Sequence, residues 1–89
     1  MARFLVTYDL VAANDYRHII AELERLGAVR SLLSTYLVNV NLEDSAGFLQ
    51  HLRAFVDADD RLMVVKLSER PSYTRAFTGT NEWIARNFP

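Results

Sequence analysis

Residues 2–9 read Ala-Arg-Phe-Leu-Val-Thr-Tyr-Asp, and the fold class follows from where this stretch lies in the sheet. The run from Ala2 to Tyr8 is almost entirely apolar or β-prone, which predicts a strand buried on both faces and therefore central in its sheet. Asp9 ends the run, at the kind of strand end where connecting loops gather ligands. For an isolated Tyr-Asp-Leu triplet, a side chain that caps the following turn is the better interpretation of Asp9, and a functional site is the other.

A helix is predicted to follow a short linker over residues 10–13. Asn14 is a good N-cap, because its side chain can accept hydrogen bonds from free backbone N–H groups. Gly27 supplies the C-terminal stop. Between these two residues, apolar side chains recur at helical spacing: Tyr16, Ile19, Ile20, Leu23 and Leu26.

The segment 28–67 predicts more strand structure around a second helix. Residues 28–40 have β character but are too many for one strand, so we expect a kink or tight hairpin near 31–34. An acidic turn over 57–60 leads to another central-looking strand over 61–67. The second helix is capped by Asp44 or Ser45, and its apolar face consists of Phe48, Leu49, Leu52, Phe55 and Val56.

The order β-α-β(β)-α-β predicts an α+β domain of the ferredoxin-like class. This is a split βαβ sandwich, in which an antiparallel sheet carries two helices on one face. We expect the domain to span residues 1–67. Residues 68–89 are expected to form a C-terminal strand or helix extension that docks on the domain or on a dimer partner, with Thr80 or Asn81 capping a short final helix.

The second face of this sheet is expected to lack a cover within the chain. Val6, Tyr8, Tyr36 or their neighbours must point to that face. An uncovered apolar sheet face implies a partner, most simply a second copy, so we expect a homodimer. A domain of 89 residues is also small enough to gain stability from a dimer interface.

Composition narrows the class of protein. The net charge of −1 argues against strong non-specific binding to duplex DNA, which needs a basic surface. The chain has no cysteine, which excludes disulfide scaffolds and thiolate metal sites. Its apolar runs are too short for a signal peptide or a membrane helix, so we expect a cytoplasmic protein with no membrane contact.

Several other residues and segments are more typical of structural roles than of a functional site. His18 and His51 fall beside the apolar stripes of their helices, which is typical of surface residues rather than of metal ligands. The acidic run 57–60 lacks the spacing and the glycine of a calcium loop and predicts a solvated turn. Aromatic and basic residues alternate in the tail, a pattern that can clamp single strands, but docking on the sheet of a partner is the interpretation we favour. These tail residues are Arg70, Tyr73, Arg75, Phe77, Trp83, Arg86 and Phe88.

Two motifs together resemble a known family. A first strand that ends in Tyr8-Asp9-Leu10 is followed, after a helix, by Gly27, Arg30 and Ser34-Thr35-Tyr36. This spacing resembles the CRISPR-associated spacer-acquisition protein of the Cas two family, whose pattern is a strand ending Tyr-Asp and later Gly-x-x-Arg-x-x-x-Ser-Val-Phe. The likeness covers about the first 67 residues. It is greater to small stand-alone relatives of that family, which also carry a tryptophan in a short last helix, as Trp83 does here.

The resemblance implies a homodimer packed sheet to sheet, with Asp9 of each copy facing the other across the two-fold axis. In members described as nucleases, this carboxylate pair holds one Mg²⁺, so Asp9 is both the expected catalytic residue and the expected metal ligand. The expected nucleic-acid-binding residues are Tyr8, Arg30, Ser34 and Tyr36, with RNA favoured over duplex DNA. A related expectation is a likeness to toxins of the virulence-associated-protein-D type.

The chain departs from the family pattern at two places. The first loop of the family is usually basic, whereas Val11-Ala12-Ala13-Asn14-Asp15 carries no basic residue, and Leu32 stands where a glutamine is common. Both departures weaken the case for contacts to nucleic acid. Three interpretations stay open from the sequence: a Mg²⁺-dependent endoribonuclease, a non-catalytic dimeric module that binds nucleic acid or protein, and a structural role in which Asp9 caps a turn.

Overall fold

The computed structural model describes residues 1–9 and 16–89 of the chain. The predicted linker over 10–13, the predicted cap Asn14 and the non-basic loop 11–15 lie outside this part. The described elements are β1 (Ala2–Asp9), α1 (Arg17–Arg25), β2 (Val29–Leu32), β3 (Thr35–Val40), α2 (Ser45–Leu52), a short 3-10 helix η1 (Arg53–Phe55), β4 (Arg61–Lys66) and α3 (Thr80–Asn87).

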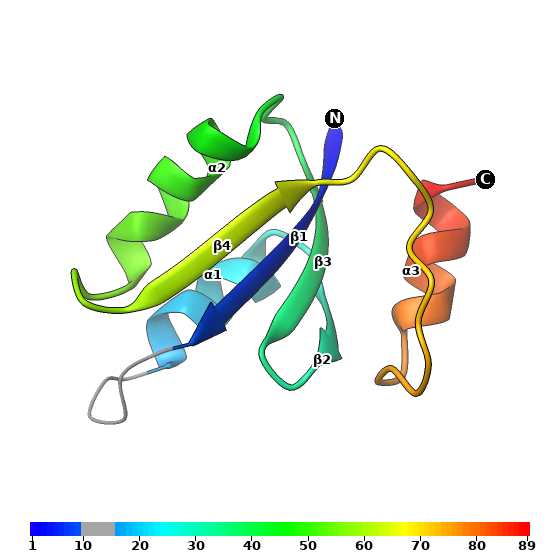
Figure 1. Cartoon of the computed structure of the whole chain (residues 1–89), viewed down its shortest axis with the longest axis horizontal. Coiled ribbons are helices and arrows are strands. Elements are labelled where there is room, and N and C mark those ends of the chain that lie inside the picture. The colour runs from blue at the N-terminus through cyan, green and yellow to red at the C-terminus, as the bar shows by residue number, and fades with distance from the viewer. Residues whose placement is uncertain (10–15) are drawn as a thin grey trace.

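The four strands form one antiparallel sheet in the order β2-β3-β1-β4 (Figure 1). The ferredoxin-like α+β fold is confirmed, and so are the central place of β1 and the hairpin, which turns between Leu32 and Thr35. The prediction of a second central strand over 61–67 is wrong, because β4 lies at the edge of the sheet. Its run is apolar because Leu62 and Val64 pack on the core, while Met63 and Val65 on the other face are 62% and 46% exposed.

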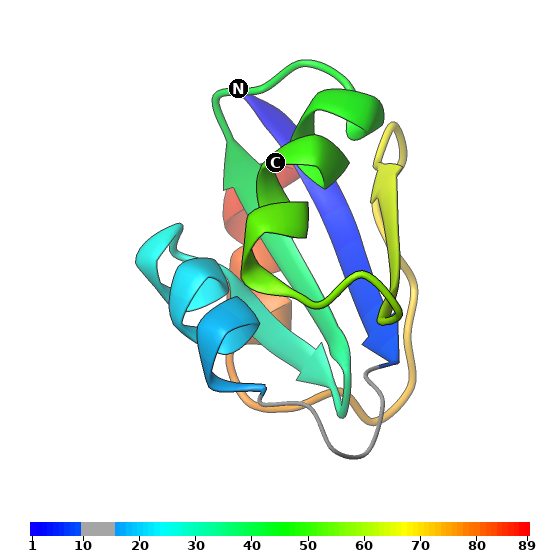
Figure 2. The same cartoon turned by 90° about the vertical axis from the view of Figure 1, so that its left-hand side faces the viewer.

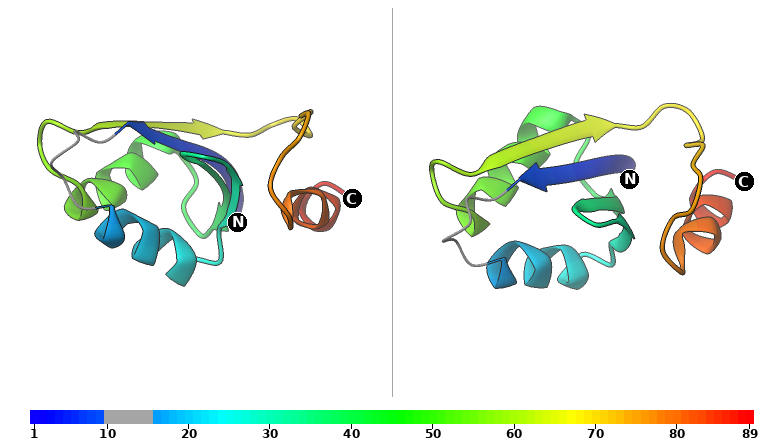
Figure 3. Two further views of the ribbon diagram at one scale, coloured as in Figure 1. Left: turned by 90° about the horizontal axis from the view of Figure 1, so that it is seen from below. Right: turned by 60° about the horizontal axis from the view of Figure 1, so that its bottom comes forward.

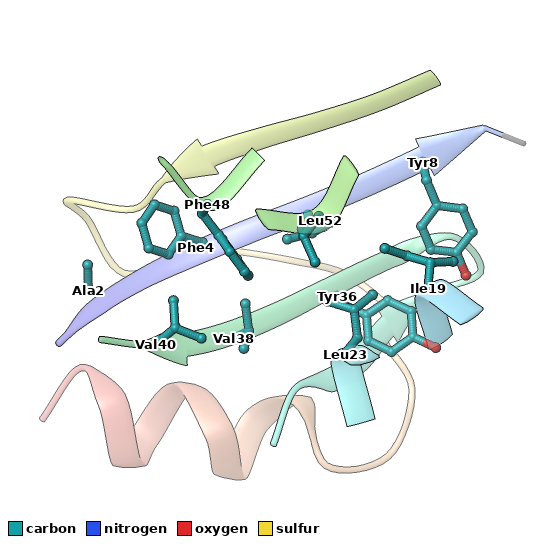
Figure 4. Packing of buried hydrophobic residues seen from close by; sticks show 11 residues of the cluster. Ala2, Phe4, Tyr8, Ile19, Leu23, Tyr36, Val38, Val40, Phe48 and Leu52 are labelled. Atoms are coloured by element: carbon teal, nitrogen blue, oxygen red, sulfur yellow. The ribbon is translucent and has the colours of Figure 1, made fainter. Parts of the chain in front are cut away.

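Helices α1 and α2 lie side by side on one face of the sheet (Figure 2). Alternate side chains of β1 point at them, as the two-residue period of a strand requires. Phe4 packs on Phe48 of α2 with ring centroids 5.0 Å apart. The core on this face, most of which Figure 4 labels, consists of Ala2, Phe4, Val6, Tyr8, Ile19, Leu23, Tyr36, Val38, Val40, Phe48 and Leu52.

On the opposite face of the sheet, only the half formed by β2 and β3 is covered by a described helix. Helix α3 packs on β2 and β3 from the side away from α1 and α2 (Figure 3). Trp83 and Ile84 are 2% and 1% exposed there and bury Leu37. The expectation of an uncovered face is therefore wrong for this half, because the short tail returns to the sheet. Val6, Tyr8 and Tyr36 point to the helical face instead.

The ends of the helices follow the sequence with one difference. Asp44 caps α2 as predicted, with its Oδ1 accepting from the Gly47 N–H at 2.9 Å. Gly27 stops α1 with a φ of 79°, a backbone conformation that favours glycine. Helix α3 starts after Gly79, whose φ is 98°, and neither Thr80 nor Asn81 serves as its cap. The Thr80 hydroxyl instead donates to the buried Ser31 hydroxyl at 3.0 Å.

The C-terminal end of α3 is held by two arginines. Arg3 of β1 donates to the Asn87 carbonyl at 2.7 Å and lies 4.2 Å from the centroid of the Phe88 ring. Arg70 donates to the Phe88 carbonyl at 2.8 Å. Cations at this end also complement the helix dipole, so α3 is a well-anchored third layer. Among the described residues, no helix is long and apolar enough to cross a membrane.

Candidate functional site

Asp9 lies on the face of the sheet that α1 and α2 do not cover. Since Tyr8 points to the helices, its neighbour Asp9 points the opposite way. Asp9 is the antiparallel partner of Arg61, the first residue of β4. Its Oδ2 accepts from the Arg61 Nη1 at 3.0 Å, and the two side chains are 72% and 82% exposed. An ion pair this exposed contributes about 0–1 kcal/mol, so Asp9 remains open to other cations.

An open hollow of about 220 Å³ surrounds this pair. The hydroxyls of Thr7 on β1 and Thr35 on β3 face each other at 3.2 Å next to it, on the same face. The hollow is lined by Thr7, Tyr8, Asp9, Arg61, Leu62 and Met63. The turn-capping interpretation of Asp9 concerns the loop after it, which lies outside the described residues.

Tyr8 and Tyr36 are buried in the core at the same end of the sheet, 6% and 4% exposed. Their rings stack with centroids 6.2 Å apart, and Tyr16 meets Tyr8 edge-on at 5.9 Å (Figure 4 shows Tyr8 and Tyr36). Burial, followed by the neighbouring Tyr36, raises the pKa of Tyr8 to about 12, although the positive charge of Arg30 acts in the opposite direction. The Tyr8 phenol is thus a protonated core group, and both rings lie on the face away from Asp9.

Arg30 and Ser34 belong to the hairpin between β2 and β3. Arg30 donates from Nε and Nη2 to the Leu33 carbonyl, at 3.0 and 2.8 Å, and so ties the hairpin tip. Its guanidinium lies 5.3 Å from the centroid of the Phe77 ring. The Ser34 carbonyl accepts from the Tyr8 N–H at 3.1 Å, which places the hairpin tip next to the end of β1.

The structure thus brings the four predicted nucleic-acid contacts to one end of the sheet but not to one surface. Asp9 shares its surface with Arg61, Thr7 and Thr35, none of which we selected from the sequence. Arg61 could have been selected only from the strand register, because the antiparallel pairing of β1 with β4 places the first residue of β4 opposite the last residue of β1. That register depends on which strands are adjacent, and the periodicity of the sequence does not contain it.

The metal-binding capacity of one copy is low. The described residues contain no group of three or more histidine and acidic side chains able to hold a metal ion. In the acidic run, Asp60 Oδ2 accepts from the Asp57 N–H at 2.8 Å, which is the hydrogen bonding of the predicted turn. Asp9 carries exposed carboxylate oxygens, which are the kind of donor that Mg²⁺ prefers.

The two histidines lie away from Asp9. His18 is exposed on α1. His51 of α2 contacts Glu22 of α1, with its Nε2 2.6 Å from the Glu22 Oε2. Glu22 is buried and also accepts two hydrogen bonds from Arg25, both at 2.7 Å. Glu22 was not predicted as a buried group, because a glutamate beside Leu23 on a helix has no pattern that indicates burial.

The fold and the site define a class: a ferredoxin-like α+β domain with an exposed carboxylate at the end of its central strand, on the open half of the sheet. The family described as CRISPR associated protein Cas2 matches residues 1–74, and the chain belongs to that family. The match includes β1, the hairpin and β4, and it ends before α3. No solved structure matches the chain closely.

Proposed function

We propose that the chain works as a homodimer that cleaves RNA with the help of Mg²⁺, using the Asp9 carboxylates of both copies. The observation that carries this proposal is the position of Asp9, exposed at the end of the central strand on the half of the sheet that α3 leaves open. Membership of the Cas2 family supports it, since that family is generally dimeric and associated with nucleic acid.

The open half of the sheet fits a second copy of itself. Met63 and Val65 supply exposed apolar surface next to Asp9 and Arg61. A two-fold axis through this surface sets Asp9 and Arg61 of one copy against the same residues of the other, so the interface is self-complementary in charge. Two carboxylates that approach each other need a cation or a proton between them.

The residues of this surface suit a shared Mg²⁺, with Asp9 as the ligand and Arg61 as the neighbouring charge. Asp9 of each copy would hold the ion, which supplies a lowered pKa of bound water and neutralises charge on a phosphate. The Arg61 ion pair is weak enough to give way to a divalent cation. Arg61, once released from Asp9, can donate to phosphate oxygens, for which the guanidinium geometry is suited.

The test is cleavage of end-labelled RNA and DNA oligonucleotides with and without Mg²⁺. Wild type should cleave RNA only with the metal, and Asp9→Asn should abolish this cleavage while the fold is kept. Asp59→Asn, which removes an exposed carboxylate from the turn before β4, is the matched control and should cleave like wild type. Equal cleavage by Asp9→Asn and wild type would contradict the proposal.

Gel filtration tests the dimer separately. The chain has a mass of 10.2 kDa, and the proposal requires a species of twice that mass. A strictly monomeric chain that still cleaved RNA would show that one Asp9 is sufficient and would overturn the shared pair.

A second function is favoured by the register of Asp9 with Arg61. A carboxylate already paired in the folded chain can serve as an interface residue in a non-catalytic dimeric module that binds nucleic acid or protein. In that case neither wild type nor Asp9→Asn cleaves, and both bind the same oligonucleotide equally well.

A further inference from the structure

We call the segment between β4 and α3, residues 67–79, the strap. In Figures 1 and 3 it leaves the end of β4, passes along the outside of the sheet and leads into α3. The aromatic residues of the tail divide into two groups. Trp83 and Phe88 pack in the cluster under α3, whereas Tyr73 and Phe77 of the strap are 47% and 49% exposed. The docking of α3 on the sheet therefore accounts for only two of the four aromatic residues of the tail.

Tyr73 lies on the same face of the sheet as Asp9. It lines a small apolar cavity of about 90 Å³ together with Leu32 and Thr35. Thr35 in turn contacts Thr7, which lines the hollow around Asp9. Because β1 and β2 are separated only by β3, roughly 10 Å lies between the two strands. A continuous surface thus leads from Asp9 across the threonine pair to Tyr73.

Phe77 lies at the free edge of β2. Its N–H donates to the Ser31 carbonyl at 2.9 Å, which fixes the strap along that edge. The Arg30 guanidinium lies 5.3 Å from the ring centroid, and its two hydrogen bonds to the Leu33 carbonyl keep it there. Phe77 is thus a half-exposed ring with a cation beside it, a combination that favours a stacked base and its phosphate.

Charge is unequal on the two sides of Asp9. Towards α2, the turn before β4 carries Asp57, Asp59 and Asp60. Towards the strap lie Arg30 and the exposed Arg75. Counting also Arg61 on the first side and Glu69 of the strap on the second, acidic residues outnumber arginines on the first side and arginines outnumber acidic residues on the second, so a polyanion is attracted mainly from the strap side.

We infer that Tyr73 and Phe77 form a stacking platform for single-stranded RNA on the strap side of Asp9. This inference rests on the proposed function, since it assigns a path to the substrate of the same site. A single strand is required because its bases are free to stack on aromatic side chains, and such stacking tolerates any sequence. Tyr73 lies at the end of the part of the chain that the family matches, and Phe77 lies beyond it.

The test measures binding without cleavage. Fluorescence anisotropy is recorded for a labelled oligouridine about 12 nucleotides long, in EDTA, with every variant built on Asp9→Asn. Tyr73→Ala and Phe77→Ala should each weaken binding roughly 5- to 100-fold, the range for loss of one stacked base. Tyr73→Phe and Phe77→Tyr should retain affinity. Arg53→Ala, which removes an exposed cation from η1 on the other face, is the control and should bind like its parent.

Two readouts keep the outcomes distinct. Emission of Trp83, the single tryptophan of the chain, reports whether α3 stays docked in each variant. With α3 docked, unchanged RNA affinity in Tyr73→Ala and Phe77→Ala overturns the platform, and a protein-docking role for these rings would then be the better account. No binding by the parent at any concentration overturns it as well.

Cleavage assays on chains with the native Asp9 separate the two proposals. A chain that cleaves RNA but binds it independently of Tyr73 and Phe77 overturns the platform alone. A chain that binds through both rings but cleaves nothing overturns only the nuclease and leaves the platform in place.

Discussion

Glu22 joins the two helices beneath the sheet through its contacts with Arg25 and His51. Its hydrogen bonds from Arg25, opposed by burial and assisted by His51, lower the pKa of this carboxyl from 4.5 to about 2. A carboxyl whose pKa is depressed on folding stabilises the native state above its unfolded value. That contribution is lost as the pH falls from about 4.5 towards 2.

Glu22→Gln should therefore destabilise the fold in a pH-dependent way. Near neutral pH we expect a loss of about 1–2 kcal/mol in the free energy of unfolding, because the charge-assisted bonds to Arg25 and His51 disappear. Near pH 2 the two proteins should be almost equally stable. Urea unfolding monitored by Trp83 emission measures both values, and an equal loss at neutral and acid pH would contradict the role of the ionised carboxylate.

At the scale of elements, local signals predicted most boundaries and non-local pairing decided the rest. The hairpin near 31–34, the Asp44 cap and the Gly27 stop each depend on a few neighbouring residues, and each was predicted. The edge position of β4, and the docking of α3 on the sheet of its own chain rather than of a partner, depend on residues far apart in the chain. An apolar run such as 62–65 has the same composition at an edge as in the centre, so the sequence could not distinguish them.

The two glycines with positive φ should differ in their tolerance of alanine. Gly27→Ala meets no atom within 4 Å, so its cost is the left-handed backbone alone, about 1–2 kcal/mol. At Gly79 the added Cβ also approaches the Val29 Cγ2 to 3.2 Å. Thermal unfolding should therefore show a greater loss for Gly79→Ala than for Gly27→Ala, and the reverse order would contradict the packing of α3 on β2.

The docking of α3 has its own test in Ile84. Ile84→Ala removes a fully buried side chain between α3 and Leu37 and should cost about 2–4 kcal/mol. Arg86→Ala, on the exposed side of the same helix, should change the unfolding free energy little. If both variants unfold like wild type in urea, α3 is not the third layer of the folded chain.

At the scale of the whole molecule, the position of α3 divides the outer face of the sheet into a covered and an open half. The covered half lies over β2 and β3, and the open half carries Asp9, Arg61 and Met63. The sequence predicted Asp9 as the residue to test but not its surface, because that surface is defined by the neighbouring strands and by the returning tail. A second copy on the open half would bring two Asp9 carboxylates together.

The most direct test of this shared site is the stoichiometry of Mg²⁺ binding by isothermal titration calorimetry. The account predicts one ion for every two chains, and no binding by Asp9→Asn under the same conditions. One ion per chain, or equal binding by wild type and Asp9→Asn, would contradict a site built from the Asp9 pair.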